Sequence, residues 1–193
     1  DGTSDARTIK DFGATDYFNL IINDTNGTPA NRDTFAAGAA LTVAGDFTIT
    51  DGAVTTTTNN LAVTGNMSVA TDGSFVSTSG TETIGGTLTN AATFTAGSGT
   101  LTVTGNVTNS AGTFNGGSGT NDLNGNLTIS GGTYTATSGT TTLAGDIDSS
   151  GGGTFTHNSG TVTMDGTDQH FIGSNTFNNL SKTSAGAETL SFT

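Results

Sequence analysis

Residues 100–119, TLTVTGNVTNSAGTFNGGSG, are one copy of a phrase that recurs along most of the chain. Each copy is anchored by Ser-Gly-Thr, and successive anchors are spaced by 19, 20, 20 and 21 residues. The anchor threonines are Thr81, Thr100, Thr120, Thr140 and Thr161. Self-similarity at a fixed period is typical of stacked repeat architectures. The phrase therefore predicts a repeat protein whose unit is about 20 residues long.

Apolar residues form three columns at fixed offsets within this unit. One column lies two residues before a recurring glycine, the second lies two residues after it, and the third lies six residues before the next anchor threonine. The recurring glycines are Gly45, Gly65, Gly86, Gly105, Gly125, Gly145 and Gly166. The first column is Val43, Val63, Ile84, Val103, Leu123, Leu143 and Met164. The second is Phe47, Met67, Leu88, Val107, Leu127 and Ile147, and the third is Val54, Phe75, Phe94, Phe114, Tyr134 and Phe155.

Within each unit the apolar residues alternate with Thr, Ser, Asn or Ala, which is typical of strands with one buried face. Threonine and valine are stiff at χ1 and favour strands. We therefore predict an all-β chain that forms a parallel β-solenoid, or β-helix. It should have about 20 residues per coil and three short strands in each coil.

The corners between strands are expected where glycine and its neighbours occur. We expect the recurring glycine to supply a positive φ there, and the residue after it to bond local backbone. The residues after it are Asp46, Asn66, Asn106, Asn126 and Asp146. One residue after the anchor, Glu82, Asn121 and Thr141 replace leucine or valine. This mixed stripe is expected to lie near a corner.

The regularity of the phrase divides the chain into three regions. Residues 1–40 are predicted to form an N-terminal cap and irregular first coils, and residues 41–166 the regular solenoid coils. Residues 167–193 are predicted to be an irregular C-terminal coil or a junction to a further repeat. An extra residue at Gly151-Gly152-Gly153 and the polar Asp168 in an apolar column indicate loosening after Met164.

The two ends of the chain share short sequences in the same order. Asp-Gly-Thr occurs at 1–3 and at 165–167, followed by YFNL at 17–20 and TFNNL at 176–180. We interpret the chain as one period of a longer tandem protein. This interpretation predicts self-association end to end, or contact with neighbouring repeats of a longer chain.

Charge and composition exclude several classes of partner. The formal net charge is −12, and the four cations are Arg7, Lys10, Arg32 and Lys182. A nucleic acid partner needs several Lys or Arg contacts, so none is predicted, and adsorption to anionic lipid is excluded likewise. No apolar run approaches the ~18 residues of a membrane helix, so no membrane insertion is expected. The absence of cysteine excludes disulfides and thiolate metal sites.

The residues that could support catalysis are few and scattered. His157 and His170 are the two histidines; Asp165 and Asp168 lie near the second in sequence, but no nucleophilic serine turn follows. Other acids, such as Asp72, form no paired-carboxylate pattern in the sequence. We predict that the chain is not an enzyme and has no catalytic, cofactor-binding or metal-binding residues.

Calcium is the one cofactor that the sequence leaves as an alternative. Carboxylate and carbonyl oxygens at solenoid corners suit this cation. Residues 116–122, GGSGTND, resemble a calcium-binding nonapeptide repeat, but they occur once and lack the aspartate at successive repeats. A solvated glycine-rich turn is the favoured interpretation.

Pairs of threonines form the candidate recognition surface. Alternate residues of a strand point to opposite faces, so Thr-x-Thr pairs at one strand position should form outward ranks of hydroxyl and methyl groups. The candidate residues are Thr81, Thr83, Thr100, Thr102, Thr140, Thr142, Thr161 and Thr163. These ranks resemble the Thr-x-Thr face of solenoid ice-binding proteins, although threonine is also a good outward residue for any strand.

Longer phrases carry a second resemblance. SGTLTVTGNVTNSAGTF at 98–114 and SGTVTMDGTDQHFIGSNTFNNLSK at 159–182 are similar to the repeats of filamentous-haemagglutinin-like and autotransporter-passenger β-solenoids of bacterial surfaces. The resemblance covers residues 41–182. It implies an extracellular or cell-surface stalk, adhesin or fibre-forming module without catalytic residues, for which a surface glycan is a candidate partner. Ice binding and a carbohydrate-binding or carbohydrate-active β-helix are the alternative functions.

Overall fold

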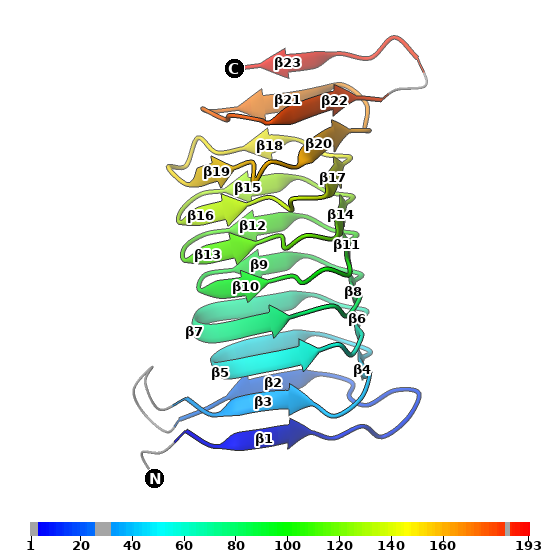
Figure 1. Cartoon of the computed structure of the whole chain (residues 1–193), viewed down its shortest axis with the longest axis vertical. Helices are drawn as coiled ribbons and strands as arrows, with labels where there is room; N and C mark the ends of the chain where they lie inside the picture. The colour runs from blue at the N-terminus through cyan, green and yellow to red at the C-terminus, as the bar shows by residue number, and fades with distance from the viewer. Residues whose placement is uncertain (1–3, 26–31, 184–185) are drawn as a thin grey trace.

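The computed structural model describes residues 4–25, 32–183 and 186–193. The Asp-Gly-Thr at 1–3, on which the likeness of the two chain ends partly rests, lies outside these residues. The described residues are all-β and contain no helix, and their parallel strands stack into a β-solenoid of about eight turns with roughly 20 residues per turn. Figure 1 shows the coils stacked along one axis with the two termini at opposite ends. The predicted fold class is confirmed.

Each coil passes through three faces of the solenoid. The first face is an eight-stranded sheet. Its strands are β4 (Leu41–Val43), β6 (Leu61–Val63), β8 (Glu82–Ile84), β11 (Thr100–Val103), β14 (Thr120–Leu123), β17 (Thr140–Leu143), β20 (Thr161–Met164) and β22 (Asn179–Lys182).

The second and third faces belong to one 15-stranded sheet, because the 11-residue strands β5 (Phe47–Thr57) and β7 (Met67–Ser77) run through both faces. The second face also contains β2 (Leu20–Asn23), β9 (Leu88–Asn90), β12 (Val107–Asn109), β15 (Leu127–Ile129), β18 (Ile147–Asp148), β21 (Gln169–Ile172) and β23 (Leu190–Phe192). The third face also contains β1 (Ala6–Ile9), β3 (Thr34–Ala37), β10 (Thr93–Thr95), β13 (Thr113–Asn115), β16 (Thr133–Thr135) and β19 (Thr154–Thr156).

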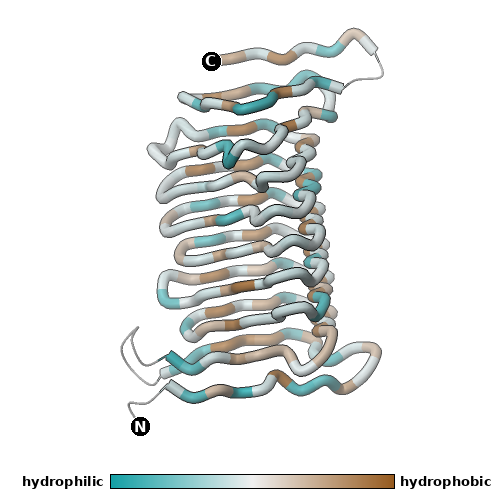
Figure 2. Tube along the Cα trace, in the orientation of Figure 1, coloured by the Kyte–Doolittle hydropathy of each residue, from teal (hydrophilic) through white to brown (hydrophobic). Residues whose placement is uncertain are grey.

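Equivalent residues of successive coils lie directly above one another. Strand β12 pairs with β15 in parallel, with Val107 opposite Leu127, and β13 pairs with β16, with Phe114 opposite Tyr134. This register converts the apolar columns of the sequence into continuous interior columns. In Figure 2 they form brown segments that recur at the same place in successive coils.

The aromatic column of the third face is a stack of rings. The ring centroids of Phe75 and Phe94 lie 5.0 Å apart, those of Phe94 and Phe114 4.7 Å, and those of Phe114 and Tyr134 4.6 Å. All four side chains are fully buried. Aromatic side chains bury large apolar areas and gain further from ring contacts, so this column contributes strongly to the cohesion between coils.

A further interior column lies on the second face, where the sequence did not reveal it. Ile49, Val69, Asn90, Asn109 and Ile129 follow one another there, and all five are fully buried. The Asn90 Nδ2 donates to the Asn109 Oδ1 at 2.7 Å, and the Asn109 Nδ2 donates to the carbonyl oxygen of Gly131 at 2.8 Å. The Asn90 Oδ1 accepts from the backbone N–H of Ala92 at 3.3 Å. Buried polar groups are stable when they are hydrogen-bonded in this way.

The recurring corner glycines serve a different purpose from the one expected. None of them has a positive φ; other glycines, such as Gly112 and Gly132, do. A Cβ on Gly105 would instead lie 2.7 Å from the carbonyl oxygen of Gly86 in the preceding coil. Glycine is therefore required because the backbones of successive coils approach closely at this corner.

The residues after these glycines also differ from the prediction, since they bond the next coil and not local backbone. The Asn106 Oδ1 accepts a hydrogen bond from the backbone N–H of Asn126 at 2.9 Å, and the Asn126 Oδ1 accepts one from Asp146 at 2.9 Å. The Asp46 Oδ1 accepts one from Asn66 at 2.8 Å in the same way. These side chains form a corner ladder that links each coil to the next.

Candidate functional surfaces

The eight candidate threonines all lie on the first face, at outward positions of β8, β11, β17 and β20 or directly before β8. Their strands are in register, with Thr83 opposite Thr102 and Thr142 opposite Thr163. Strand β14 interrupts one of the two ranks, because Asp122 lies between Thr102 and Thr142. Thr81 and Thr83 are exposed, whereas the other six are half-buried.

Threonine ranks also occur on the other faces. On the third face Thr93 pairs with Thr113, and Thr113 pairs with Thr133. On the second face Thr108 pairs with Thr128. An outward threonine is therefore a general property of these coils, as its preference for half-buried strand surfaces explains.

The mixed stripe of the first face lies inside strands, which corrects its expected position near a corner. Glu82 is the first residue of β8, and Asn121 and Thr141 are the second residues of β14 and β17. All three occupy inward positions and are almost fully buried. Glu82 pairs with Leu61 on one side and Leu101 on the other. The alternation of apolar and polar residues along the strand sets its register, and a single polar residue at an inward position does not change that register.

Glu82 is a buried carboxyl group with incomplete hydrogen bonding. Neither of its oxygens has a hydrogen-bond partner among the described residues, and neither do the hydroxyls of Ser77 and Thr56. Burial raises the pKa of Glu82 to about 7, because loss of water disfavours the charged form. The nearby Ser77 hydroxyl opposes this rise, although it lacks the geometry of a hydrogen bond.

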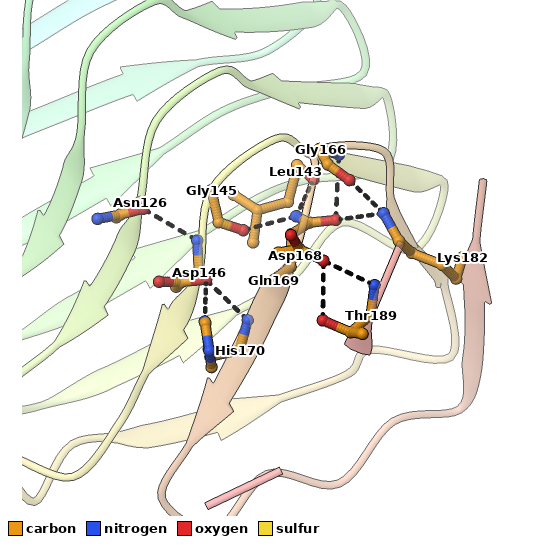
Figure 3. Close-up of polar contacts among 10 residues, drawn as sticks. All are labelled: Asn126, Leu143, Gly145, Asp146, Gly166, Asp168, Gln169, His170, Lys182 and Thr189. Carbon is orange, nitrogen blue, oxygen red and sulfur yellow. Dashed lines mark hydrogen bonds and ion pairs between the residues drawn. The ribbon is translucent and has the colours of Figure 1, made fainter. Parts of the chain in front are cut away.

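His170 pairs with an acid other than the two that lie near it in sequence. Its backbone N–H donates to the Asp146 Oδ1 at 2.7 Å, and its ring Nδ1 lies 3.3 Å from the same oxygen (Figure 3). Asp168 faces away toward the last coil, where its Oδ1 accepts hydrogen bonds from the backbone N–H and the hydroxyl of Thr189 at 2.9 Å each. The arrangement around His170 thus continues the corner ladder.

Gln169 holds the last coils together from a buried position. Its Nε2 donates to the carbonyl oxygens of Leu143 at 2.8 Å and Gly145 at 2.7 Å, and its Oε1 accepts from the backbone N–H of Gly166 at 3.0 Å (Figure 3). The Lys182 Nζ donates to the same Oε1 at 3.0 Å. This role is not visible in the sequence, because glutamine at an inward position resembles a break in the repeat.

The described residues contain no pocket, and no group of three His, Asp or Glu side chains among them could hold a metal ion. Asp122, from the stretch that resembles a calcium-binding repeat, lies on the outward side of β14, and its Oδ1 accepts a hydrogen bond from the Thr142 hydroxyl at 3.2 Å. No helix that could span a membrane occurs in the described part of the chain.

Large exposed apolar side chains are found in the first and last coils. Among the described residues they are Phe12, Phe18, Ile21, Leu180 and Phe192. Contiguous apolar exposure often marks an interaction site. The first and last coils therefore expose large apolar side chains, whereas the sides of the solenoid present ranks of threonine.

These features define the class of the protein, a parallel β-solenoid. No protein-family model matches the chain, and comparison with curated proteins and with solved structures gives no match.

Proposed function

We propose that this β-solenoid is a structural or adhesive extracellular module that assembles end to end into a filament or stalk. The observation that carries the proposal is the contrast between the ends and the sides of the solenoid. The ends present unpaired strand edges and apolar side chains, whereas the sides present ranks of threonine.

The strand edges at both ends support this assembly. Among the described strands, β1 pairs with β3 alone, β22 with β20 alone and β23 with β21 alone. An unpaired edge presents free N–H and C=O groups on which another strand can add. A second copy stacked on the end would continue the parallel sheets.

The apolar side chains at the ends would gain from the same contact. Phe192 lies on Phe171 with a centroid distance of 5.1 Å, yet its side chain is 65% exposed because no further coil covers it. Burial of such surface stabilises an association by about 25 cal/mol for each Å² of apolar area. Covering Phe192 and Leu180 would extend two interior columns across the junction.

Charge disfavours association through the sides. Ten of the 16 acids, and no cation, lie between Asp33 and Ser181 in the sequence. Like charges on two approaching sides repel each other at low ionic strength. End-to-end contact avoids most of this repulsion.

Sedimentation velocity and electron microscopy over a range of concentrations test the proposal. We expect linear oligomers whose population rises with concentration, and we expect Phe192→Lys to shift them toward the monomer. Thr102→Lys, which adds the same charge on the first face, is the matched control and should leave end-to-end assembly intact. A wild-type protein that stays monomeric at every concentration would contradict the proposal, and so would equal effects of the two variants.

The location and the adhesive partner are further parts of this proposal. They are supported by the resemblance of residues 41–182 to repeats of bacterial surface proteins. Protease treatment of intact cells that produce the native protein should remove it if it is displayed outside. A glycan array tests the surface-glycan partner, and cleavage of any bound oligosaccharide would favour the carbohydrate-active alternative.

Ice binding is the second candidate, and the register of the first face favours it. Thr83 lies opposite Thr102 and Thr140 opposite Thr161, so the hydroxyls and methyls form ordered ranks. Thermal hysteresis that is lost in Thr102→Lys but kept in Thr113→Lys on the third face would support this function. Absence of both thermal hysteresis and ice shaping in the wild type would remove it.

A further inference from the structure

Glu82 occupies a position that leucine occupies in the coils on both sides. In the first face, β8 lies between β6 and β11, and the register places Glu82 between Leu61 and Leu101. Its side chain is fully buried. The carboxyl group is therefore enclosed in the interior of the solenoid, with apolar side chains above and below it.

Among the described residues, no charged group compensates for this burial. Strands β6, β8 and β11 contain no other titratable residue, and the nearby hydroxyl is that of Ser77. The acids of the remaining packed strands, Asp51 in β5 and Asp72 in β7, both bind Arg32 at 3.1 Å. That ion-paired group lies at the corner between the second and third faces, away from the first face that contains Glu82.

An ionised carboxylate in this position would be a lone charge in the core. Removing an unpaired charge from water costs far more than removing a neutral carboxylic acid, so the group takes up a proton instead. The two other polar residues of the same column, Asn121 and Thr141, carry an amide and a hydroxyl that do not titrate. Among Glu82, Asn121 and Thr141, Glu82 is therefore the residue whose side chain can change charge inside the solenoid.

We propose that Glu82 is a proton-binding site in the core of the solenoid, neutral in the folded protein, and that its ionisation destabilises the coil around β8. In the unfolded chain this side chain is exposed to water and ionised at neutral pH. Folding therefore takes up a proton at this site between pH 4.5 and about 7. The stability that the protonated Glu82 confers falls as the pH rises. The pairing of β8 with β6 and β11 should weaken first.

The pH range follows from linkage between proton binding and folding. The pKa of Glu82 is raised from 4.5 to about 7 on folding. The favourable contribution of the protonated group is complete below pH 4.5, falls between pH 4.5 and about 7, and is absent above that range. Since each pKa unit corresponds to a tenfold change, the folding equilibrium constant should decrease about 300-fold across this range through Glu82 alone.

Carboxyl-carbon NMR tests the proposal directly in the wild-type protein. Glu82 and Glu188 are the two glutamates of the sequence, so protein labelled with ¹³C-glutamate gives two side-chain carboxyl signals. We expect one of them to titrate near pH 7 and to be missing in Glu82→Gln. The Glu188 signal, from a residue that binds Lys182 at 3.2 Å, confirms the assignment. A Glu82 signal that titrates below pH 5 in the folded protein would overturn the proposal.

Chemical denaturation as a function of pH provides the second measurement. Glu82→Gln should remove the loss of stability between pH 4.5 and 8, whereas Asp165→Asn, an exposed acid on the same side of the solenoid, should keep it. Glu82→Leu, which matches both neighbouring coils, should behave like Glu82→Gln and serves if the glutamine variant folds poorly. Hydrogen exchange rates, corrected for their intrinsic pH dependence, should increase with pH in β6, β8 and β11. The rates in β17 and β20 should increase only at higher pH. Equal pH slopes in wild type and Glu82→Gln would contradict the proposal.

Discussion

The middle coils and the two end coils belong to the same stack of parallel strands, but their residues have different numbers of neighbours. Phe114 lies between Phe94 and Tyr134 and is fully buried, whereas Phe192 lies on Phe171 alone and is mostly exposed. The comparison teaches that position in the stack determines the energetic role of a residue. A residue of the middle has contacts on both sides that stabilise the fold, whereas Phe192, at the end of a column of the second face, has a stacked ring on one side.

The largest difference is expected for glycine substitutions at the backbone contacts between coils. In Gly119→Ala, the added methyl group would overlap the carbonyl oxygen of Gly99, which belongs to the backbone of the preceding coil. We expect a loss of more than about 4 kcal/mol, or failure to fold, because the strain cannot be relieved by a side-chain movement. Gly186→Ala in the last coil, where a Cβ has no atom within 4 Å, should melt like the wild type. Circular dichroism melts compare the two, and a Gly119→Ala protein of normal stability would show that the coils separate easily.

Truncation of the aromatic column should give the next largest effect. Phe114→Ala removes two stacked ring contacts and leaves a cavity between coils, which costs about 3–5 kcal/mol for a buried phenylalanine. Phe192→Ala should cost less than about 1 kcal/mol, because its ring is mostly exposed and has one stacked partner. Urea denaturation of both variants measures the contrast. Similar losses in the two would mean that the end coil is covered in solution.

Each hydrogen bond of the corner ladder should contribute less to the free energy of unfolding than a buried aromatic ring does. Asn126→Ala removes the acceptor for the backbone N–H of Asp146, and loss of one exposed hydrogen bond of this kind costs about 1 kcal/mol. The effect should be global, since this coil lies in the middle. Asp168→Ala should leave the global melting temperature unchanged and release the last strand, β23, through loss of its bonds to Thr189. Hydrogen exchange distinguishes global from local loss.

The smallest effect is an acid-induced loosening of the last coil. Hydrogen bonds from the backbone N–H and hydroxyl of Thr189 lower the pKa of Asp168 below its usual 3.8. The stabilising contribution of the ionised group is present above pH 3.8 and is lost as the pH falls through the lower pKa of the folded state. The Thr189 amide resonance should therefore shift on acidification below that value, and Asp168→Asn should abolish the shift. A shift that persists in the variant would assign it to another group.

The sequence predicts the repeat and most of the columns because close packing imposes the same residue type on every coil. Val103, Val107 and Phe114 are inward and fully buried, as their period requires. The failures occur where one residue type satisfies two physical demands. Glycine permits both a positive φ and a close backbone approach, and Gly86, whose carbonyl oxygen requires the approach at Gly105, lies 19 residues earlier in the sequence.

Polar residues that bond the next coil could not be assigned from the sequence. The buried Asn90 donates to Asn109 in the next coil, and the exposed Asn126 accepts a hydrogen bond from Asp146, so their partners lie about one coil away in the sequence. Glu82 has no such hydrogen-bond partner. It is buried because inward and outward residues alternate along β8, although its side chain is polar. The candidate threonines could be assigned to one face from the sequence, and Thr93, Thr133 and Thr154 flank the aromatic column in the sequence. The register adds the pair of Thr108 and Thr128 on the second face.

The direction of the hydrogen bonds between coils has a mechanical consequence. Strands lie across the long axis of the solenoid (Figure 1), and the bonds between parallel neighbours run along the direction in which the strands are spaced. A pulling force along this axis stretches the coil-to-coil junctions in series, so that the weakest junction yields first and the rod lengthens one coil at a time. Bending loads the same junctions unevenly, because it stretches the hydrogen bonds on the convex face and compresses those on the opposite face.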